Sequence, residues 1–311
     1  MVVDQIGKIA EGVYMLGHRA APLFLVDGNQ PALFDAGFAF LGPVYARQVR
    51  QVLNHRQPAW CFLTHSHFDH CGAVAYLKDQ FPQIKVVCSP KAANVFDRPN
   101  AIARISDLNH VAAGMAADLG FEPENAQFEP FRVDVTAGEG DCFEISPDLT
   151  IQTMETPGHT WDFLSYYIPQ RRLLVASEAV GTPDETGYIV TDCLVDYDIH
   201  YQSMQRLSTL DVETLCLGHI YSCTGSDARR HMTESLVHSR RFRSMVERLL
   251  TEENGNIRVV MKRVKAVEWD GKPGLRQPEP AYLLNLEARV KTVLRKWEET
   301  RSVDPLKKET V

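Results

Sequence analysis

The sequence predicts an α/β fold in which two similar halves pack face to face and a helical region follows. Three observations lead to this prediction. The 311 residues are 44% hydrophobic and 23% charged, as is typical of a globular protein. Along the chain, strand-rich and mixed stretches alternate twice before a helical pattern takes over. The length suits two average domains or one large one.

The first half is expected to begin with short strands that are separated by glycines. The spacing of Val44, Val49 and Val52 favours a helix, and residues 112–119 are rich in strong helix formers. The expected elements are strands at 13–16, 23–26, 32–34, 61–63 and 85–88 and helices at 43–54, from about Gly72, and at 90–120.

The second half is expected to return to strands before the helical region begins. The expected elements are strands at 130–135, 149–155, 163–168, 172–176 and 214–217 and a helix at 200–209. From about 227 to 300 the pattern is helical, with a break at 271–274. We therefore expect one α/β domain over residues 1–225 and a helical extension over 226–311, which covers a cleft or forms a homodimer interface.

The charge and the start of the chain limit the classes of partner. A formal net charge of -7 argues against nucleic acid, because nucleic-acid platforms carry a basic excess. The first residues show neither a basic segment nor a long apolar run, and later apolar stretches are strand-sized. We therefore expect a cytoplasmic protein without a membrane partner. Arginines between 227 and 248 indicate either a solvated helix face or a positive patch for an anionic substrate.

The residues after the strand at 61–63 give the strongest functional signal. The run Thr64-His65-Ser66-His67-Phe68-Asp69-His70-Cys71-Gly72 places three histidines and an aspartate within six residues. Alternate side chains of an extended segment share a face, so His65 and His67 can point the same way. Asp69 and His70 can turn toward the same region as a helix begins. Imidazole nitrogens and carboxylate oxygens suit zinc, iron or manganese.

Three further strand ends carry a residue of the same chemical kind. His159 follows the strand at 149–155, Glu178 ends the run 173–178, and His219 follows 215–217 and a glycine. If the four strand ends meet in one cleft, they bring together five histidines and two carboxylates. This set is too large for one tetrahedral ion and suits two ions that share a ligand.

These motifs together resemble the metallo-β-lactamase-fold hydrolases. The run His65-x-His67-x-Asp69-His70 resembles the family signature, and Thr156-Pro157-Gly158-His159, the strand end at 174–179 and Gly218-His219 follow in the family's order. Phe34-Asp35-Ala36-Gly37 resembles the family's Asp-x-Gly turn, whose aspartate supports the histidine loop. The resemblance covers about residues 10–225. It implies a four-layer αββα metallo-β-lactamase sandwich, here followed by the helical extension.

The resemblance also implies a role for each candidate ligand. Two divalent metal ions are expected as cofactors, with zinc first and iron or manganese as alternatives. Glu178 stands where the family usually has a bridging aspartate, and its extra methylene adds about 1.5 Å of reach. It therefore bridges the two ions, binds one of them only, or leaves the second site weak. The first ion is expected on His65, His67 and His159, and the second on Asp69, His70 and His219.

Catalytic and supporting roles follow from the same resemblance. Asp69 is expected to hold the attacking water and to move its proton to the leaving group. The hydroxyl of Tyr221 either donates to a developing oxyanion or packs at the rim of the site; Tyr188 and Tyr197 are weaker candidates. Groups that orient the imidazoles are expected at Thr64, Asp35 and Thr160.

The implied activity is metal-dependent hydrolysis of an ester, thioester or lactone of a small molecule. The arrangement is similar to glyoxalase-II-like and quinolone-signal-response-like thioesterases. Three alternatives stay open: a di-iron redox enzyme, a phosphodiesterase or nuclease, and a metal-holding regulatory protein with weak catalysis. Against the first, flavodiiron relatives tend to have glutamate in place of His67 and carry a flavodoxin-like domain, for which the segment after Gly225 is too short and too helical.

Overall fold

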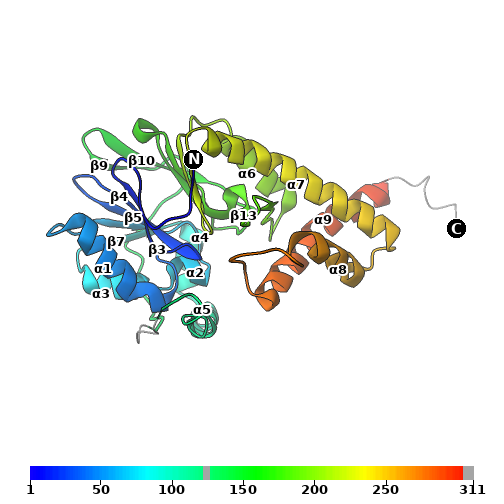
Figure 1. Ribbon diagram of the computed structural model, residues 1–311, viewed down its shortest axis with the longest axis horizontal. Helices are drawn as coiled ribbons and strands as arrows, with labels where there is room; N and C mark the ends of the chain where they lie inside the picture. The colour runs from blue at the N-terminus through cyan, green and yellow to red at the C-terminus, as the bar shows by residue number, and fades with distance from the viewer. Residues whose placement is uncertain (122–126, 304–311) are drawn as a thin grey trace.

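The protein is a four-layer αββα sandwich from which a helical extension projects (Figure 1). The computed structural model describes residues 1–121 and 127–303, and within these ranges it contains two seven-stranded sheets and a two-stranded hairpin. The two large sheets pack face to face, and helices cover their outer faces. The predicted fold class is confirmed. Residues 304–311 of the expected extension lie outside the described ranges.

The first sheet is built from the N-terminal half, in the order β2-β3-β4-β5-β6-β7-β8. Strands β2 to β5 pair antiparallel, whereas β5 to β8 pair parallel. The strands are β2 (Gly7–Ala10), β3 (Val13–His18), β4 (Ala21–Val26), β5 (Ala32–Phe34), β6 (Trp60–Phe62), β7 (Lys85–Cys88) and β8 (Val135–Thr136). The helices of this half are η1 (Ala39–Leu41), α1 (Gly42–Leu53), α2 (Phe68–Cys71), α3 (Val74–Gln80), α4 (Pro90–Phe96) and α5 (Pro99–Ala113).

The second sheet has the order β1-β16-β15-β12-β11-β10-β9, so the N-terminal strand joins its far edge. Its strands are β1 (Val2–Val3), β9 (Cys142–Ser146), β10 (Leu149–Glu155), β11 (Leu164–Ile168), β12 (Leu173–Val175), β15 (Thr214–Cys216) and β16 (Ser222–Thr224). The other elements before the extension are η2 (Pro169–Arg171), η3 (Ser177–Val180), the hairpin β13 (Thr182–Pro183) and β14 (Ile189–Val190), and α6 (Tyr197–Leu207).

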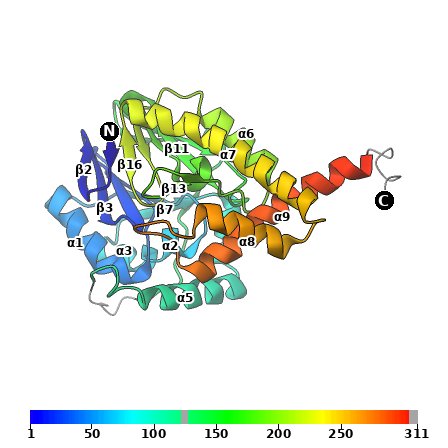
Figure 2. The same ribbon diagram turned by 45° about the vertical axis from the view of Figure 1, so that its right-hand side comes forward.

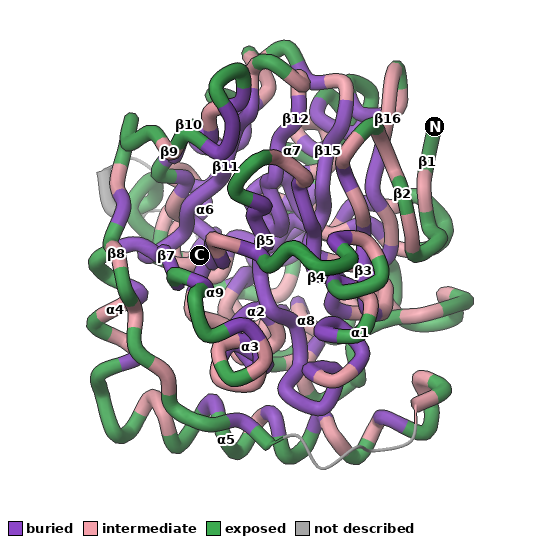
Figure 3. The backbone as a smooth tube through the Cα atoms, turned by 90° about the vertical axis from the view of Figure 1, so that its left-hand side faces the viewer, coloured by how far each residue is buried: buried purple, intermediate pink, exposed green. Residues whose placement is uncertain are grey.

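Alternating side chains explain why whole strands are buried in both sheets (Figure 3). In β4, Leu23 and Leu25 face the helices, whereas Phe24 and Val26 face the other sheet. A sheet that is covered on both faces buries both sets of side chains, so its strands are apolar throughout. Between the sheets, the hydroxyl of Tyr166 donates to the carbonyl of Leu63 over 2.7 Å.

Two expected elements differ from the structure. The helix expected over 90–120 is two helices, because Pro99 has no N–H to continue the first and instead begins α5. The second helix ends at Ala113, and residues 114–120 form turns rather than the expected helix. The strand expected over 130–135 is reduced to β8, at Val135–Thr136. Just before β8, the carboxylate of Asp134 accepts from the backbone N–H of Val86 over 2.8 Å. A side chain here takes the place of a backbone carbonyl in the hydrogen bonding between the strands.

Residues 226–303 of the C-terminal region form three helices with a core of their own. Helix α7 (Ser226–Glu252) leaves the sandwich, and α8 (Ile257–Glu268) and α9 (Glu279–Val303) pack against it (Figure 2). Their shared core includes Phe242, Val260 and Leu286. None of the helices in the described ranges has both the length and the apolar character that crossing a bilayer requires.

Candidate metal centre

All seven residues expected to bind metal are brought together at the ends of β6, β10, β12 and β15. The two sheets meet here. The backbone N–H of Leu164, in β11 of the second sheet, donates over 2.8 Å to the carbonyl of Thr64, which follows β6 of the first sheet. The seven residues form three overlapping groups, and within each group the ligand atoms lie within 4.8 Å of one another. The first group is His65, His67 and His159, and the second group is Asp69, His70 and His219. The remaining set, His65, His70 and Glu178, shares one histidine with each of them.

The first group consists of three imidazoles whose free nitrogens face one another. The Nδ1 atom of His65 lies 2.9 Å from the hydroxyl of Thr64, and Nδ1 of His159 lies 2.8 Å from the carbonyl oxygen of Asp192. Because these contacts occupy the Nδ1 atoms, the Nε2 atoms of both rings point toward the other members of the group. His67 presents Nδ1, which lies 3.1 Å from Nε2 of His159. The Nε2 atom of His65 is buried and has no hydrogen-bond partner among the described residues.

The second group combines two imidazoles with a carboxylate. Nδ1 of His70 lies 2.9 Å from Asp35, and Nδ1 of His219 lies 2.5 Å from the carbonyl oxygen of Ala20. Their Nε2 atoms therefore face the group, as in the first set. Asp69 lies farther out, with oxygens 4.0 Å from Nε2 of His70 and 3.8 Å from Nε2 of His219.

Asp35 supports both groups, because it contacts Thr64, which holds His65, and also His70. Its carboxylate accepts from the backbone N–H of Thr64 over 2.8 Å and from the hydroxyl of Thr64 over 3.0 Å, and it also contacts His70. Its φ of 57° is in the left-handed region, which aspartate tolerates better than most residues. The supporting positions predicted for Thr64 and Asp35 are thus observed. The hydroxyl of Thr160, the third candidate, is buried without a hydrogen-bond partner in the described ranges.

Glu178 lies against the second group through a single oxygen. Its Oε1 atom is 2.8 Å from Nε2 of His70 and 2.7 Å from Nε2 of His219. The His70 contact lacks hydrogen-bond geometry, so the two atoms are close without pointing at each other. Its Oε2 atom accepts from the hydroxyl of Ser177 over 2.6 Å. Oε1 is therefore the carboxylate oxygen that lies against the imidazoles of the second group.

Gly218 provides the space that the longer side chain of Glu178 needs. A Cβ atom at this position would lie 2.7 Å from Oε1 of Glu178 and 2.6 Å from the hydroxyl oxygen of Ser177. Real Cβ atoms essentially never make contacts this short. The glycine before His219 thus lets Glu178 reach the second group.

The electrostatics of the two groups differ. Burial, strengthened by neighbouring imidazoles, holds the pKa values of His65 and His159 well below the ordinary value, so both rings are neutral and able to bind a metal. Burial also lowers the pKa of His219, but Glu178 outweighs it and raises that pKa to about 8. Burial disfavours the charged form of Glu178, yet His70 and His219 hold the pKa of this carboxyl well below its usual range.

The raised pKa of His219 predicts a pH dependence of stability in the metal-free protein. The folded protein holds the proton more tightly, so stabilisation is complete below the ordinary pKa of 6.5 and is lost as pH rises through about 8. This difference corresponds to about 2 kcal/mol. We expect His219 to lower the free energy of unfolding of chelator-treated protein by about this amount between pH 6 and pH 9. His70, whose pKa burial lowers but Glu178 and Asp35 raise well above the ordinary value, adds a fall in the same direction. Urea titrations of the parent protein and of Glu178→Gln at both pH values would measure the part that depends on Glu178. An equally steep fall in Glu178→Gln would contradict this assignment.

The tyrosine candidates lie in different surroundings. Tyr221 packs its ring against His231 on α7, with ring centroids 6.4 Å apart, and burial raises the pKa of its hydroxyl. A catalytic role for Tyr221 stays a prediction. The hydroxyl of Tyr188 donates to Glu268 over 3.0 Å, and that of Tyr197 donates to the carbonyl of Ser239 over 3.1 Å.

Two supports of the candidate centre have no residue-type signal in the sequence. The carbonyls of Ala20 and Asp192 hold His219 and His159, and any residue could supply a carbonyl. Phe163, whose ring stacks on His65 with centroids 4.6 Å apart, was also missed. Its place three residues after Gly-His-Thr could have suggested it, since apolar groups next to metal-site histidines exclude water.

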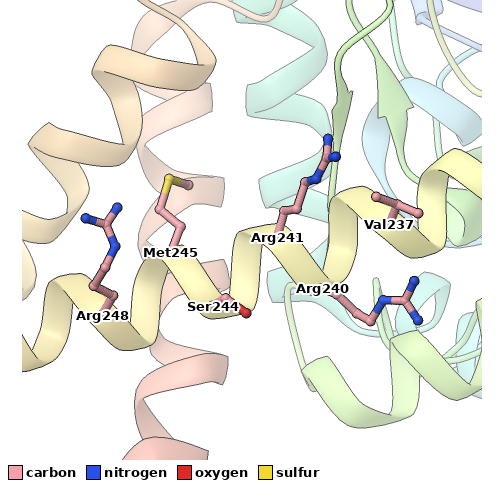
Figure 4. A pocket seen from close by; sticks show the side chains of 6 residues that line it. All are labelled: Val237, Arg240, Arg241, Ser244, Met245 and Arg248. Carbon is pink, nitrogen blue, oxygen red and sulfur yellow. The ribbon is translucent and has the colours of Figure 1, made fainter.

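The arginine-rich stretch forms a stripe along α7 rather than part of the candidate centre. A shallow pocket on this helix is lined by Val237, Arg240, Arg241, Ser244, Met245 and Arg248 (Figure 4). Arg248 pairs with Glu252 on the same helix, and Arg243 pairs with Glu247 and with Asp198 on α6. These pairs support the interpretation of a solvated helix face.

The αββα fold and the clustered histidines are those of a metal-binding protein with the metallo-β-lactamase fold. The Metallo-beta-lactamase superfamily pattern matches residues 19–219, well over half of the chain, and the protein belongs to this superfamily of mainly metal-dependent hydrolases.

Individual relatives are distant. "Probable metallo-hydrolase YflN" of Bacillus subtilis (strain 168) is 24% identical over 247 residues, which are 73% of this chain and 90% of that protein. A hydroxyacylglutathione hydrolase of Rhodopseudomonas palustris (strain ATCC BAA-98 / CGA009) is 29% identical over 164 residues, and the match spans 52% of this chain but only 48% of the relative. The crystal structure of a metallo-beta-lactamase family protein from Thermus thermophilus has a TM-score of 0.63 at 16% identity and covers 94% of this chain and 95% of the other.

Proposed function

We propose that the protein is a dinuclear metal-dependent hydrolase that acts on a small acyl compound, with a thioester first and an ester or lactone next. One observation carries the proposal. Each of the five histidines has one ring nitrogen directed into a shared space, and four of them are held from behind through the other nitrogen. Outer-shell contacts of this kind orient imidazoles for a metal.

The residues fit two divalent ions, with zinc first and iron or manganese as alternatives. Neutral imidazoles are the form that binds metal, and burial keeps His65 and His159 neutral. The buried Nε2 of His65, with no hydrogen-bond partner in the described part of the chain, would gain one in a bound ion. We propose His65, His67 and His159 for one ion and Asp69, His70 and His219 for the other, with Glu178 between them.

The ions would supply Lewis acidity, which makes hydroxide available near neutral pH and polarises an acyl carbonyl. The protein's own contribution includes a carboxylate at the open side of the cluster. The side chain of Asp69 is 18% exposed, against 4% for Glu178. Asp69 can therefore meet an entering water, accept its proton and pass that proton to the leaving group.

The substrate class rests on the relatives together with this chemistry. The hydroxyacylglutathione hydrolases that match the chain are named for an acyl compound, although the chain spans about half their length. The proposed site needs only a carbonyl and a leaving group that can be protonated. A small anionic acyl compound also remains part of the proposal.

Metal analysis and a substrate panel test this function. Purified protein is expected to hold two equivalents of zinc, iron or manganese per chain. Metal-loaded protein is expected to cleave at least one of an acyl thioester, a p-nitrophenyl ester and a lactone, faster than bis-p-nitrophenyl phosphate, and chelation is expected to abolish the rate. A metal content of one or none would overturn the dinuclear site, and cleavage of the phosphodiester alone would overturn the acyl substrate.

A further inference from the structure

Residues 192–196 form a segment that lies directly against the turn carrying His159. The carbonyl of Asp192 lies 2.8 Å from Nδ1 of His159, and since a carbonyl only accepts, this nitrogen carries the proton. The backbone N–H groups of Val195 and Asp196 both donate to the carbonyl of Gly158, over 3.1 and 3.4 Å. Three backbone contacts thus fix the position of His159 and leave its Nε2 free for the first group.

The other side of the same segment is held by α9. The hydroxyl oxygen of Thr292 lies 3.3 Å from the carbonyl oxygen of Cys193 and 3.5 Å from its Sγ atom, while its hydrogen has a nearer acceptor on α9, the carbonyl of Arg289 at 2.7 Å. A guanidinium nitrogen of Arg295 donates to the carbonyl of Val195 over 2.6 Å. Residues three apart on a helix lie on neighbouring parts of its surface, so both side chains reach the same segment. Thr292 is buried, with 2% of its surface exposed.

A buried ion pair fixes α9 to the rest of the extension. Arg289, one turn before Thr292, donates to both carboxylate oxygens of Glu268 on α8, over 2.8 and 2.6 Å. Glu268 also accepts from the hydroxyls of Tyr282 and Tyr188. Because Tyr188 immediately precedes β14, the ion pair also reaches the chain that leads into residues 192–196.

We propose that α9 is a brace for the candidate metal centre, in which Thr292 and Arg295 are positioning residues that set the place of His159 through residues 192–196. The inference rests on the proposed function insofar as His159 binds a metal. It assigns the helical extension a role in the first group of ligands, from more than 130 residues farther along the chain. Among the described residues, no hydrogen bond joins residues 192–196 directly to Asp69, His70 or His219, whose ring contacts run instead to Asp35 and Ala20.

The double variant Thr292→Val, Arg295→Met removes both contacts and keeps the volume of the buried side chain. Lys291→Met is the matched control, because the ion pair of Lys291 in the described part of the chain is with Glu287 on the same helix. In metal-free protein, we expect the amides of Val195 and Asp196 to exchange about fivefold faster in the double variant, as loss of about one hydrogen bond implies. The control is expected to match the parent protein.

Titration with Co²⁺, followed by its ligand-field absorption, gives the second readout. We expect the tighter-bound and weaker-bound ions to respond differently, with one site weakened about tenfold, at the low end of the cost of losing an outer-shell partner. General destabilisation would weaken both sites alike. Thr292→Val alone, a nearly isosteric change, serves if the double variant folds poorly by circular dichroism.

The outcomes separate the brace from the proposed function. Unchanged amide exchange in the variants would overturn the brace even if the parent protein binds two ions. Faster exchange with equal weakening of both ions would overturn the specific link to His159. A parent protein that binds no Co²⁺ would overturn the proposed function and, with it, the positioning role of α9, whereas the exchange data would still report whether α9 holds residues 192–196.

Discussion

Replacing His67 by alanine is expected to lower the rate of acyl hydrolysis by about a thousandfold. The ring supplies the Nδ1 atom that faces His159 over 3.1 Å, and without it the first group keeps only two ligand nitrogens. Metal catalysis of this type contributes several kcal/mol, and each 1.36 kcal/mol is a factor of ten in rate. Steady-state kinetics on the best substrate of the panel, together with metal analysis, would measure both losses.

The appropriate control is His55→Ala, because His55 is an exposed histidine on the connection after α1. It is expected to keep the parent rate and two equivalents of metal. The variant at position 67 should retain about one ion, since the second group shares no ligand with it. A His67→Ala protein that hydrolyses its substrate at the parent rate would show that the histidine cluster does not carry the activity.

The candidate ligands could be found from the sequence because each follows a buried apolar strand. A strand of this kind is recognisable from its residues alone, and the carboxyl ends of neighbouring parallel strands meet at one edge. β12 and β15 are such a pair, which places Glu178 and His219 together. The order of the ligand motifs, combined with the family resemblance, was therefore sufficient to expect one cluster.

Features that depend on distant contacts were not available in the same way. Strands β9 and β16 were missed for different reasons. β9 does alternate, with Phe143 and Ile145 as strand formers, and this pattern was overlooked, whereas the three residues of β16 are too few to show an alternation. Pro99 marks the break between α4 and α5, and the strong helix formers at 112–119 do not extend α5 beyond Ala113. The carbonyl supports of His159 and His219 exist only once the chain has folded.

Tyr221 illustrates that a position near a ligand in sequence does not by itself determine where the side chain lies. A strand alternates its side chains, and β16 begins directly after this residue. The side chain of Tyr221 packs against α7, whose length and path the local sequence does not determine. The orientation of a residue beside a metal ligand is thus set by the packing of the next layer.

Glu178→Gln is expected to remove the second metal ion. The substitution keeps the shape of the side chain but removes the charge that lies 2.8 Å from His70 and 2.7 Å from His219. Loss of a direct ligand should exceed the 10- to 100-fold in affinity that loss of an outer-shell partner costs. Glu155→Gln, at the exposed end of β10, is the matched control. Two tightly bound ions in Glu178→Gln would show that this carboxylate is not a ligand.

The space above Gly218 provides a sharper test of the same carboxylate. Gly218→Ala places a Cβ atom 2.7 Å from Oε1 of Glu178, so the side chain must withdraw and the second ion should be lost. Shortening Glu178 to aspartate removes about 1.5 Å of reach and with it the overlap with that methyl group. Each single change, Glu178→Asp or Gly218→Ala, is expected to weaken metal binding. If a glycine is needed at position 218 because the glutamate side chain is one methylene longer than aspartate, the double variant Glu178→Asp, Gly218→Ala should bind more metal than Gly218→Ala alone. Simple addition of the two losses in the double variant would show that Gly218 serves Ser177 or the backbone instead, since independent sites do not interact in a double-mutant cycle.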